Sequence, residues 1–283
     1  MTFAQPDTQH WGGNRDIDRD RFGRPLIVPP GGGKPTAYTR CTTFVDALSD
    51  KSNLMAWKAR MAALGLARSD DLLLQIGFHD PDDKKGLDRL VDQAADLAGA
   101  SRGANIGTHI HEATEKYDRG EDLPPLGKFQ ADVDAYIQAT KGLQVEAVEQ
   151  FRVHDGLHIG GTADRLFLID GKLTIADIKT GGLWDVGKMA MQLAVYANSV
   201  PYKPETQQRE PDTHPVDTTR GLLIHLPEGK GTCDLYWLNL QVGMEAVHLA
   251  AEVRRWRRFH KNKATRQEVI VDCTPEEKRA FAG

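Results

Sequence analysis

The stretch that decides the fold reads Gly160-Gly161-Thr162-Ala163-Asp164, then Arg165 to Ile169, Asp170-Gly171, and Lys172 to Lys179. The pair Asp170-Gly171 between two apolar runs predicts a β-hairpin with a two-residue turn. Such a turn places Ile169 opposite Lys172. Counting back along the ladder places Asp164 opposite Asp177, on one face of the hairpin, where the Cβ atoms of directly opposed residues lie about 4.5–5.5 Å apart.

The hairpin therefore brings two carboxylates together, and Lys179 lies two residues beyond Asp177 on the same face. Like charges held that close destabilise a hairpin unless something offsets them. A divalent cation would do so, since Mg²⁺ prefers carboxylate oxygens. A solvated pair at the edge of the hairpin is the alternative. Leu166 and Ile175 on the same face favour burial, however, and a buried, unpaired carboxylate pair is costly.

Two further motifs flank the hairpin. Upstream, Gly107-Thr108-His109-Ile110-His111 is followed four residues later by Glu115, and downstream lies Gln192-Leu193-Ala194-Val195-Tyr196. The order G-T-x-x-H-x-x-x-E, G-x-D, D-x-K followed by Thr180-Gly181, and Q-x-x-x-Y resembles the PD-(D/E)XK nuclease superfamily. It is most similar to the RecB-like exonuclease branch of phage and bacterial type. The resemblance covers about Arg102 to Tyr196.

The resemblance implies an α/β (α+β) fold with a restriction-endonuclease-like core, in which a mixed central β-sheet is flanked by helices. It implies a Mg²⁺- or Mn²⁺-dependent deoxyribonuclease, and most simply an exonuclease that hydrolyses phosphodiester bonds in phage or bacterial DNA recombination, repair or replication. The substrate would be single- or double-stranded DNA ends. Because no G-x-x-x-x-G-K-[ST] sequence is present, we expect no bound nucleotide, and a helicase or single-strand annealing partner would be a separate chain.

The resemblance also assigns roles to residues. The catalytic set would be Asp164, Asp177, Lys179, Gln192 and Tyr196. The metal would be held by Asp164, Asp177, the carbonyl of Ile178, His111 and Glu149. Glu146 is the rival of Glu149 on the same strand. Gln192 and Tyr196, four residues apart, would orient the lysine or contact DNA, with core packing as the alternative for Tyr196.

Three other functions compete with this hypothesis. His111-Glu112 invites a zinc-protease interpretation, but that motif requires a second histidine where this chain has Glu115. A non-catalytic nucleic-acid-binding or scaffold protein could retain the nuclease fold, and a structure-specific endonuclease would use the same site. The joint presence of Asp164, Asp177 and Lys179 favours an enzyme over a scaffold.

Composition sets the broad class. The chain has 283 residues, 40% hydrophobic and 27% charged, which is ordinary for a globular protein, and no apolar run approaches the ~20 residues that span a bilayer. Met1 to Trp11 lacks a signal-peptide pattern, so we expect a cytoplasmic protein with no membrane partner. Its cysteines, Cys41, Cys233 and Cys273, are too few for the four-cysteine iron–sulfur cluster of some RecB-like nucleases, so we expect no cluster.

A basic stripe stands out against the formal net charge of −4, because Arg254 to Arg266 holds seven Lys or Arg and no acidic residue. We predict that it contacts DNA phosphates through Arg254, Arg255, Arg257, Arg258 and Lys261. A solvated helix end is the alternative. Trp256 and Phe259 continue an apolar stripe at 3–4 residue spacing, which predicts that they pack in the core.

The expected organisation is a flexible arm over 1–35, a single RecB-like domain over 36–268 and a tail over 269–283. Within the domain, 36–141 would be mostly helical and 142–266 would hold the sheet. Helical patterns occur at about 69–77, 84–99, 102–118, 127–140, 184–199 and 241–262. Strand patterns occur at about 144–153, 159–169, 172–179, 219–226 and 233–240.

Overall fold

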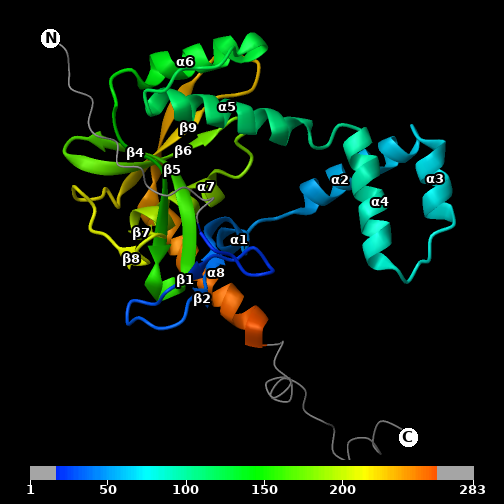
Figure 1. Cartoon of the computed structure of the whole chain (residues 1–283), viewed down its shortest axis with the longest axis horizontal. Helices are drawn as coiled ribbons and strands as arrows, with labels where there is room; N and C mark the ends of the chain where they lie inside the picture. Colours follow the sequence, from blue (N-terminus) through cyan, green and yellow to red (C-terminus); the bar gives the residue numbers. More distant parts are fainter. Residues whose placement is uncertain (1–16, 260–283) are drawn as a thin grey trace, which may run out of the picture.

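The computed structural model describes residues 17–259 and shows a sheet-centred body beside a small helical lobe (Figure 1). The elements of the N-terminal part are β1 (Leu26–Ile27), β2 (Thr36–Ala37), β3 (Thr39–Arg40), α1 (Cys41–Val45), α2 (Ser52–Leu66), α3 (Asp70–Gly77), α4 (Lys84–Leu97), α5 (Arg102–Asp118) and α6 (Gln130–Thr140). The remainder comprises β4 (Gln144–His154), β5 (Ile159–Ile169), β6 (Lys172–Lys179), α7 (Val186–Ala197), β7 (Val200–Lys203), β8 (Gln208–Arg209), β9 (Arg220–His225), β10 (Asp234–Asn239) and α8 (Leu240–Phe259).

The sheet of the body is mixed, as predicted for an α/β chain. Its strands lie in the order β10-β9-β6-β5-β4-β7-β8, and the short β3 pairs with one end of β5. The pairs β6–β9 and β3–β5 are parallel, and the other neighbours are antiparallel. Strands β4, β5, β6, β9 and β10 and helices α3 to α8 fall close to the ranges expected from residue patterns.

The β5–β6 hairpin has the predicted turn and register. Asp170 and Gly171 adopt positive φ angles of 52° and 75°, as a two-residue type I′ turn requires. Ile169 pairs with Lys172, and the ladder runs back to Arg165 opposite Ala176. The register expected from the turn is therefore confirmed over the paired part of the hairpin.

Helices cover both faces of the sheet. On one face, α1, α7 and α8 pack over side chains such as Leu166 and Ile175. On the other face, Ile110 of α5 and Tyr136 of α6 pack over Phe167, Ala176 and Ile178. The alternation of β-strand side chains explains this division, because Ile175 and Ala176 point to opposite faces. The core is thus built from the same strands that carry Asp164 and Asp177.

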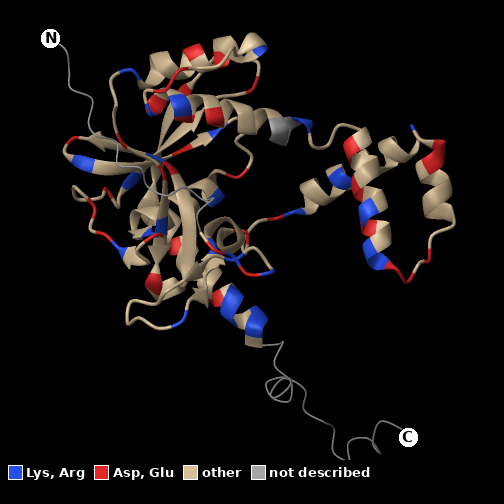
Figure 2. Cartoon of the chain, in the orientation of Figure 1, with Lys and Arg blue, Asp and Glu red and all other residues tan. Residues whose placement is uncertain are grey.

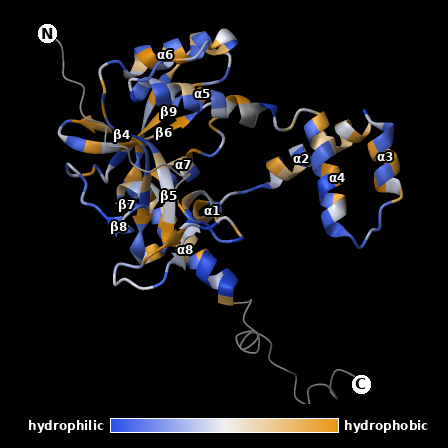
Figure 3. Ribbon diagram, in the orientation of Figure 1, coloured by the Kyte–Doolittle hydropathy of each residue, from blue (hydrophilic) through white to orange (hydrophobic). Residues whose placement is uncertain are grey.

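The helices α2, α3 and α4 form a lobe that stands apart from the sheet (Figure 1). Its buried core is small and consists of Leu72, Leu90 and Ala94. Apolar residues are spread over the lobe (Figure 3), and several of their side chains are exposed, among them Leu74 at 60% and Phe78 at 88% of full exposure. The lobe leaves the body after α1 and returns through α5, so both of its connections start beside the central sheet.

The flexible arm predicted over residues 1–35 is wrong for the part that the structure describes. Within that part, Ile17 and Ile27 are buried with Tyr38 and Phe151, whereas residues 30–36 are exposed. Strand β1 also pairs with β2. The Gly- and Pro-rich composition predicted an arm, but these apolar anchors outweigh it. The predicted 269–283 tail and Lys261 lie outside the described residues. No helix within 17–259 is both long and apolar enough to cross a lipid bilayer.

Candidate active site

The site begins where the two strands of the hairpin separate. Pairing between β5 and β6 ends at Arg165 and Ala176, and β3 pairs with β5 only at Ile159 and Gly160. Asp164 therefore does not form a ladder pair with Asp177. Instead, its carboxylate oxygen Oδ2 accepts a hydrogen bond from the Ile178 N–H at 2.9 Å. The β5–β6 ladder thus ends one residue pair before Asp164 and Asp177. The side chain of Asp164, and not the backbone of β5, accepts the hydrogen bond of the Ile178 N–H.

A cavity of about 500 Å³ lies at this opening. Its lining includes nearly all the predicted site side chains, together with two arginines from the N-terminal segment. The acidic side chains in the lining are Glu149, Asp164 and Asp177, and the basic ones are Arg19, Arg40 and Lys179, with His111, Gln192 and Tyr196 beside them. The hairpin, α5 and α7 thus converge on one hollow, as expected from the order of the motifs.

Asp177 is buried at the base of the cavity, with 3% of its surface exposed. Gln192 Nε2 donates a hydrogen bond to its Oδ1 at 3.0 Å, and the Lys179 ammonium lies 2.5 Å from its Oδ2. Burial and the nearby charge of Asp164 raise the pKa of Asp177 to about 7, although Lys179 opposes the shift. Burial alone would lower the pKa of Lys179, but the carboxylates outweigh it and raise that pKa.

His111 reaches the cavity from α5. Its Nδ1 lies 3.8 Å from Asp164 Oδ2, and Gly107, one turn earlier, packs directly against Thr180 and sets the position of the helix. Burial lowers the pKa of His111, although the charge of Asp164 opposes this shift. The ring is therefore neutral at neutral pH, the form in which an imidazole can bind a metal. Glu115 lies one turn later and pairs with Arg119 at 2.5 Å.

Glu149 occupies an unusual place on β4. Its neighbours Val148 and Gln150 pair with β5, whereas Glu149 itself has a φ of 53°, in the left-handed region that side chains rarely adopt. Burial and the charge of Asp164 raise its pKa to about 8. Strained backbone of this kind is typical of functional sites. The rival, Glu146, does not line the cavity and accepts a hydrogen bond from Gln144 instead.

The donor set has the chemistry of a site for a hard divalent cation. Three acidic side chains and a neutral imidazole face one cavity, and the buried Asp177 Oδ2 has an ion-pair partner in Lys179 but no well-oriented hydrogen bond. As the side chains are arranged, no three His, Cys, Asp or Glu groups within 17–259 are close enough to hold a metal ion. Lys179 provides the counter-charge at Asp177 in this arrangement, and the residues fit Mg²⁺ or Mn²⁺ by donor type.

Gln192 and Tyr196 share a face of α7, whose first turn is capped by Asp185. We expected Gln192 to orient Lys179. Its hydrogen bond goes to Asp177 instead, so it orients that carboxylate. Tyr196 is buried beneath Gly161, where a Cβ would lie only 2.6 Å from the tyrosine hydroxyl. Tyr196 therefore packs against the strand that carries Asp164, a side chain at position 161 would clash with it, and its catalytic role stays a prediction.

The predicted DNA-binding arginines lie on the last turns of α8 (Figure 2). Arg254 donates hydrogen bonds to Thr43 O and Thr39 Oγ1, each at 3.3 Å, and its guanidinium covers the Phe44 ring. Arg255 pairs with Glu252 on the same helix. Contact of Arg254, Arg255, Arg257 and Arg258 with DNA stays a prediction.

The prediction that Trp256 packs in the core is wrong. Its side chain is 59% exposed and its ring stacks against that of Phe259, with the ring centroids 5.8 Å apart. A spacing of 3–4 residues predicts that apolar side chains share one face of a helix. It does not predict how many turns of that face are covered by the rest of the protein. The apolar contacts of α8 with the body end before its last turn, as the buried positions Val247 and Ala250 indicate.

Sequence patterns missed several residues of the cavity. Arg19 and Arg40 line it, and both burial and the charge of Arg40 lower the pKa of Arg19, so the two cations lie close together. Thr162 also lines it, and its buried Oγ1 has no hydrogen-bond partner within the described part of the chain. No local motif marks these positions. Arg19 reaches the cavity only because the β1–β3 segment packs across the sheet.

Arg165 is fully buried directly behind the site. Its Nε lies 2.5 Å from Asp118 Oδ2, its Nη1 donates to the Asp164 carbonyl at 2.7 Å, and its Nη2 donates to Thr114 Oγ1 at 3.2 Å. The Tyr136 hydroxyl completes the set by donating to Asp118 at 2.6 Å. This network fixes the backbone of the strand that presents Asp164 to the cavity.

Comparisons with known proteins leave the family of this chain open. Neither a protein-family model nor a curated protein sequence matches it.

Proposed function

We propose that this protein is a metal-dependent deoxyribonuclease with a restriction-endonuclease-like core, of the RecB-like exonuclease type. One observation carries the proposal. Asp164, Asp177 and Lys179 converge on a single cavity whose lining also includes His111 and Glu149. Acidic side chains for a cation, a half-buried lysine and a neutral imidazole in one hollow suit hydrolysis of a phosphodiester.

The placement of the motifs on the elements supports the same proposal. The upstream histidine is on α5, Glu149 is on β4, Asp164 is on β5, the pair Asp177 and Lys179 is on β6, and Gln192 is on α7. The other three of these elements, α5, β4 and α7, meet around the central strands β5 and β6, and β9 runs parallel to β6 on its other side. A sheet meander between two motif-bearing helices suits the core that the sequence resemblance implies.

Asp164, Asp177, His111 and the Ile178 carbonyl would hold Mg²⁺ or Mn²⁺, with Glu149 beside them. When bound, the cation supplies an activated water and neutralises charge on the scissile phosphate. Gln192 keeps Asp177 oriented through its hydrogen bond to Oδ1. The Lys179 ammonium would stabilise the negative charge that develops on the reacting phosphate. Its raised pKa keeps it protonated at neutral pH.

Arg19 and Arg40 favour a polyanionic substrate. Their two guanidinium groups line the same cavity as the ammonium group of Lys179. Cations at such a position attract phosphates on either side of the one that reacts. DNA ends as the substrate, exonucleolytic action, and a place in recombination, repair or replication are the further parts of the proposal, and they rest on the resemblance.

The test uses end-labelled single- and double-stranded DNA with Mg²⁺ or Mn²⁺. We expect cleavage from the ends, with Mn²⁺ at least as effective as Mg²⁺ because an imidazole ligand suits Mn²⁺ better. Asp164→Ala, Asp177→Ala and Lys179→Ala should each reduce cleavage to background while leaving the circular dichroism spectrum unchanged. Asp170→Asn is the matched control, since this carboxylate is in the same hairpin but exposed at its turn.

Three results would contradict all or part of the proposal. Wild-type protein that binds DNA but never cleaves it with either metal would be a non-catalytic nucleic-acid-binding or scaffold protein. Full cleavage by Asp177→Ala would place the chemistry elsewhere. Cleavage of covalently closed or internally looped DNA, without release of end nucleotides, would instead identify a structure-specific endonuclease built on the same site.

A further inference from the structure

Trp184 is the most exposed large hydrophobic side chain within the described residues, at 94% of full exposure. It lies in the loop of residues 180–185 that joins β6 to α7. This loop directly follows Lys179 and precedes the helix that carries Gln192. A tryptophan ring so fully open to water is uncommon, because burying it contributes more than burying almost any other side chain.

The loop that carries this ring is fixed at both of its ends. At one end, the Glu228 N–H donates to the Thr180 carbonyl at 3.1 Å, and His225 Nε2 lies 3.1 Å from the Gly181 carbonyl. At the other end, Asp185 caps α7 and accepts a hydrogen bond from Ser49 Oγ at 3.1 Å. The indole edge also lies across Gly182, where a Cβ would be only 2.3 Å from its Nε1. The ring is therefore presented on an anchored loop.

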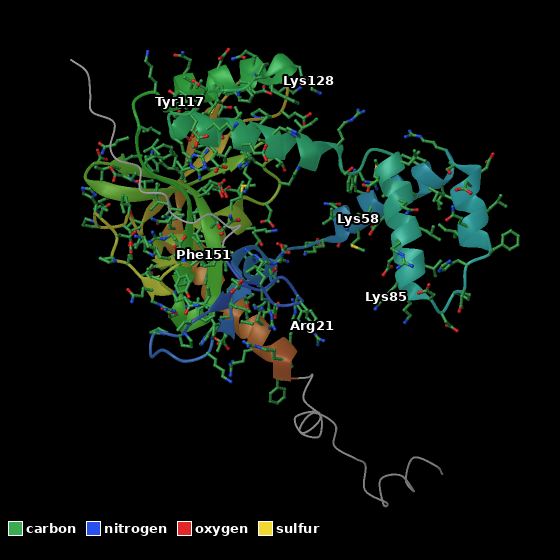
Figure 4. The ribbon with its side chains drawn as sticks, in the orientation of Figure 1. Arg21, Lys58, Lys85, Tyr117, Lys128 and Phe151 are labelled. Atoms are coloured by element: carbon green, nitrogen blue, oxygen red, sulfur yellow. The ribbon has the colours of Figure 1, made fainter. Side chains whose placement is uncertain are left out.

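The loop begins directly after Lys179, which lines the cavity, and it contacts both connections to the helical lobe. Trp184 is five residues from Lys179, so the two Cα atoms lie within about 18 Å of each other. Ser49 precedes α2, and Gly107, which packs against Thr180, follows the lobe on α5. Helix α2 contains no acidic residue and carries Lys58, which Figure 4 shows on the part of the lobe nearest the body. The loop itself is not basic, because the carboxylate of Asp185 adjoins Trp184, so recognition at this point would come from the ring and not from charge.

We propose that Trp184 is a stacking platform for an unpaired nucleobase of the strand whose phosphate enters the cavity. This inference rests on the proposed function and deepens it, because it assigns the substrate a single-stranded segment next to the cleaved bond. Every base presents a π-face, so one exposed ring binds bases without sequence preference. A protein partner is less well matched. Trp184 and its exposed neighbour Val186 offer far less than the about 800 Å² per partner of a typical stable interface.

The experiment measures affinity without cleavage, in EDTA, by fluorescence anisotropy of labelled oligomers. The probes are oligothymidylate and an abasic oligomer of equal length and charge. We expect Trp184→Ala to weaken binding of oligothymidylate by about 5- to 150-fold and binding of the abasic oligomer by less than about twofold. Trp184→Phe should restore most of the affinity. The slope of affinity against salt should not change, since no phosphate contact is lost.

Two further variants complete the test. Trp237→Ala is the matched control, because it removes another exposed tryptophan from the edge strand β10, and it should bind both oligomers like wild type. Gly182→Ala keeps the ring but displaces it, and should give a partial loss on oligothymidylate only. Thermal unfolding of Trp184→Ala should match wild type.

The proposal is overturned if Trp184→Ala binds oligothymidylate like wild type or loses affinity equally for both oligomers. It is also overturned if the variant changes self-association in sedimentation while oligomer affinity stays the same, since Trp184 is then a protein contact. The proposed function fails separately. If the protein binds bases through Trp184 but does not cleave DNA in Mg²⁺ or Mn²⁺, the nuclease proposal is wrong and the stacking role of Trp184 stands. If it cleaves DNA but Trp184→Ala binds oligothymidylate like wild type, the nuclease proposal stands and the stacking role is wrong.

Discussion

At the residue scale, the pair Asp118 and Arg165 decides whether the strand behind the site is held in place. Both side chains are almost completely buried, and the Tyr136 hydroxyl is the other partner of Asp118. Removing one member of a buried ion pair leaves the other charge without compensation. We therefore expect Asp118→Ala to lower the free energy of unfolding by about 3–5 kcal/mol.

Urea unfolding of the variant and wild type measures this loss. The matched control is Glu252→Ala, which breaks the exposed pair with Arg255 on α8 and should change stability by less than about 1 kcal/mol. A loss no larger than that of the control would show that the buried network contributes little and that Arg165 finds other partners.

Asp217 gives a stability effect that depends on pH. Burial alone would raise its pKa, but hydrogen bonds from Thr219 and Arg220 outweigh burial and lower the pKa to about 2. The folded state therefore favours the ionised carboxylate. Its contribution is fully present above the unfolded pKa near 4 and is lost as the pH falls towards about 2. We expect Asp217→Asn to be about 1–2 kcal/mol less stable than wild type at pH 7, with a smaller difference at pH 3.

Urea unfolding at both pH values checks this prediction. Asp170→Asn is the control, because Asp170 also pairs with Arg220 but is exposed, and Asn tolerates the positive φ at that turn. Its difference from wild type should be small at both pH values. An Asp217→Asn difference that stays constant between pH 7 and pH 3 would contradict the role of the charge.

The positions of site side chains could be predicted from the sequence where local backbone geometry determines them. A two-residue turn determines the register of a hairpin, so the convergence of Asp164 and Asp177 followed from Asp170-Gly171. The early separation of the strands did not, because the Asp164 carboxylate replaces a backbone partner. The left-handed backbone of Glu149 has no residue signature, since it depends on strands on both sides. Arg19 was missed because it reaches the cavity only through tertiary packing.

At the element scale, the lobe formed by α2, α3 and α4 has few buried contacts. Gly65 of α2 is its tightest point, because a Cβ there would lie 1.7 Å from the Ala94 carbonyl oxygen on α4. Alanine favours a helix over glycine by about 1 kcal/mol, but this clash involves backbone and cannot be relieved by a rotamer change. We expect Gly65→Ala to separate α2 from α4.

Hydrogen exchange read by mass spectrometry tests this expectation. Amides of α2–α4 should exchange faster in Gly65→Ala, while those of β5 and β6 should keep their protection. Gly77→Ala is the control in the same lobe, because a Cβ there meets no atom within 4 Å. If both variants protect the lobe equally, α2 and α4 can shift apart without loss of their contacts.

The extents of the helices could be predicted from periodicity, but their packing could not. The α5 and α6 patterns led to helices over the sheet, whereas α2 to α4 formed a separate lobe with Leu74 and Phe78 exposed. An apolar stripe shows that a face can be buried but does not name the surface that buries it. The stripe of α8 failed for the same reason at Trp256, which lies beyond the last buried turn.

At the scale of the whole molecule, charge is unevenly distributed. The net charge is −4, yet basic side chains occupy the last turn of α8 (Figure 2). Arg254 contacts α1 and β3, and Arg255 pairs with Glu252. The best candidates for contacts with DNA phosphates at this end of α8 are therefore Arg257 and Arg258. An acidic molecule with a local cationic end would approach DNA in a preferred orientation.

We therefore expect replacement of Arg257 and Arg258 by Gln to weaken DNA binding at every sequence. Two lost phosphate contacts should flatten the slope of log affinity against log salt by about 1.4 on single strands or 1.8 on duplex. Turnover at saturating DNA should change little, because the cavity is untouched. Lys141→Gln with Lys172→Gln is the charge-matched control, since it removes two exposed cations beside the hairpin turn. If both double variants give the same slope, net charge alone accounts for the effect. An unchanged slope for both would mean that the end of α8 faces only solvent, and the phosphates would then follow Arg19 and Arg40 into the cavity.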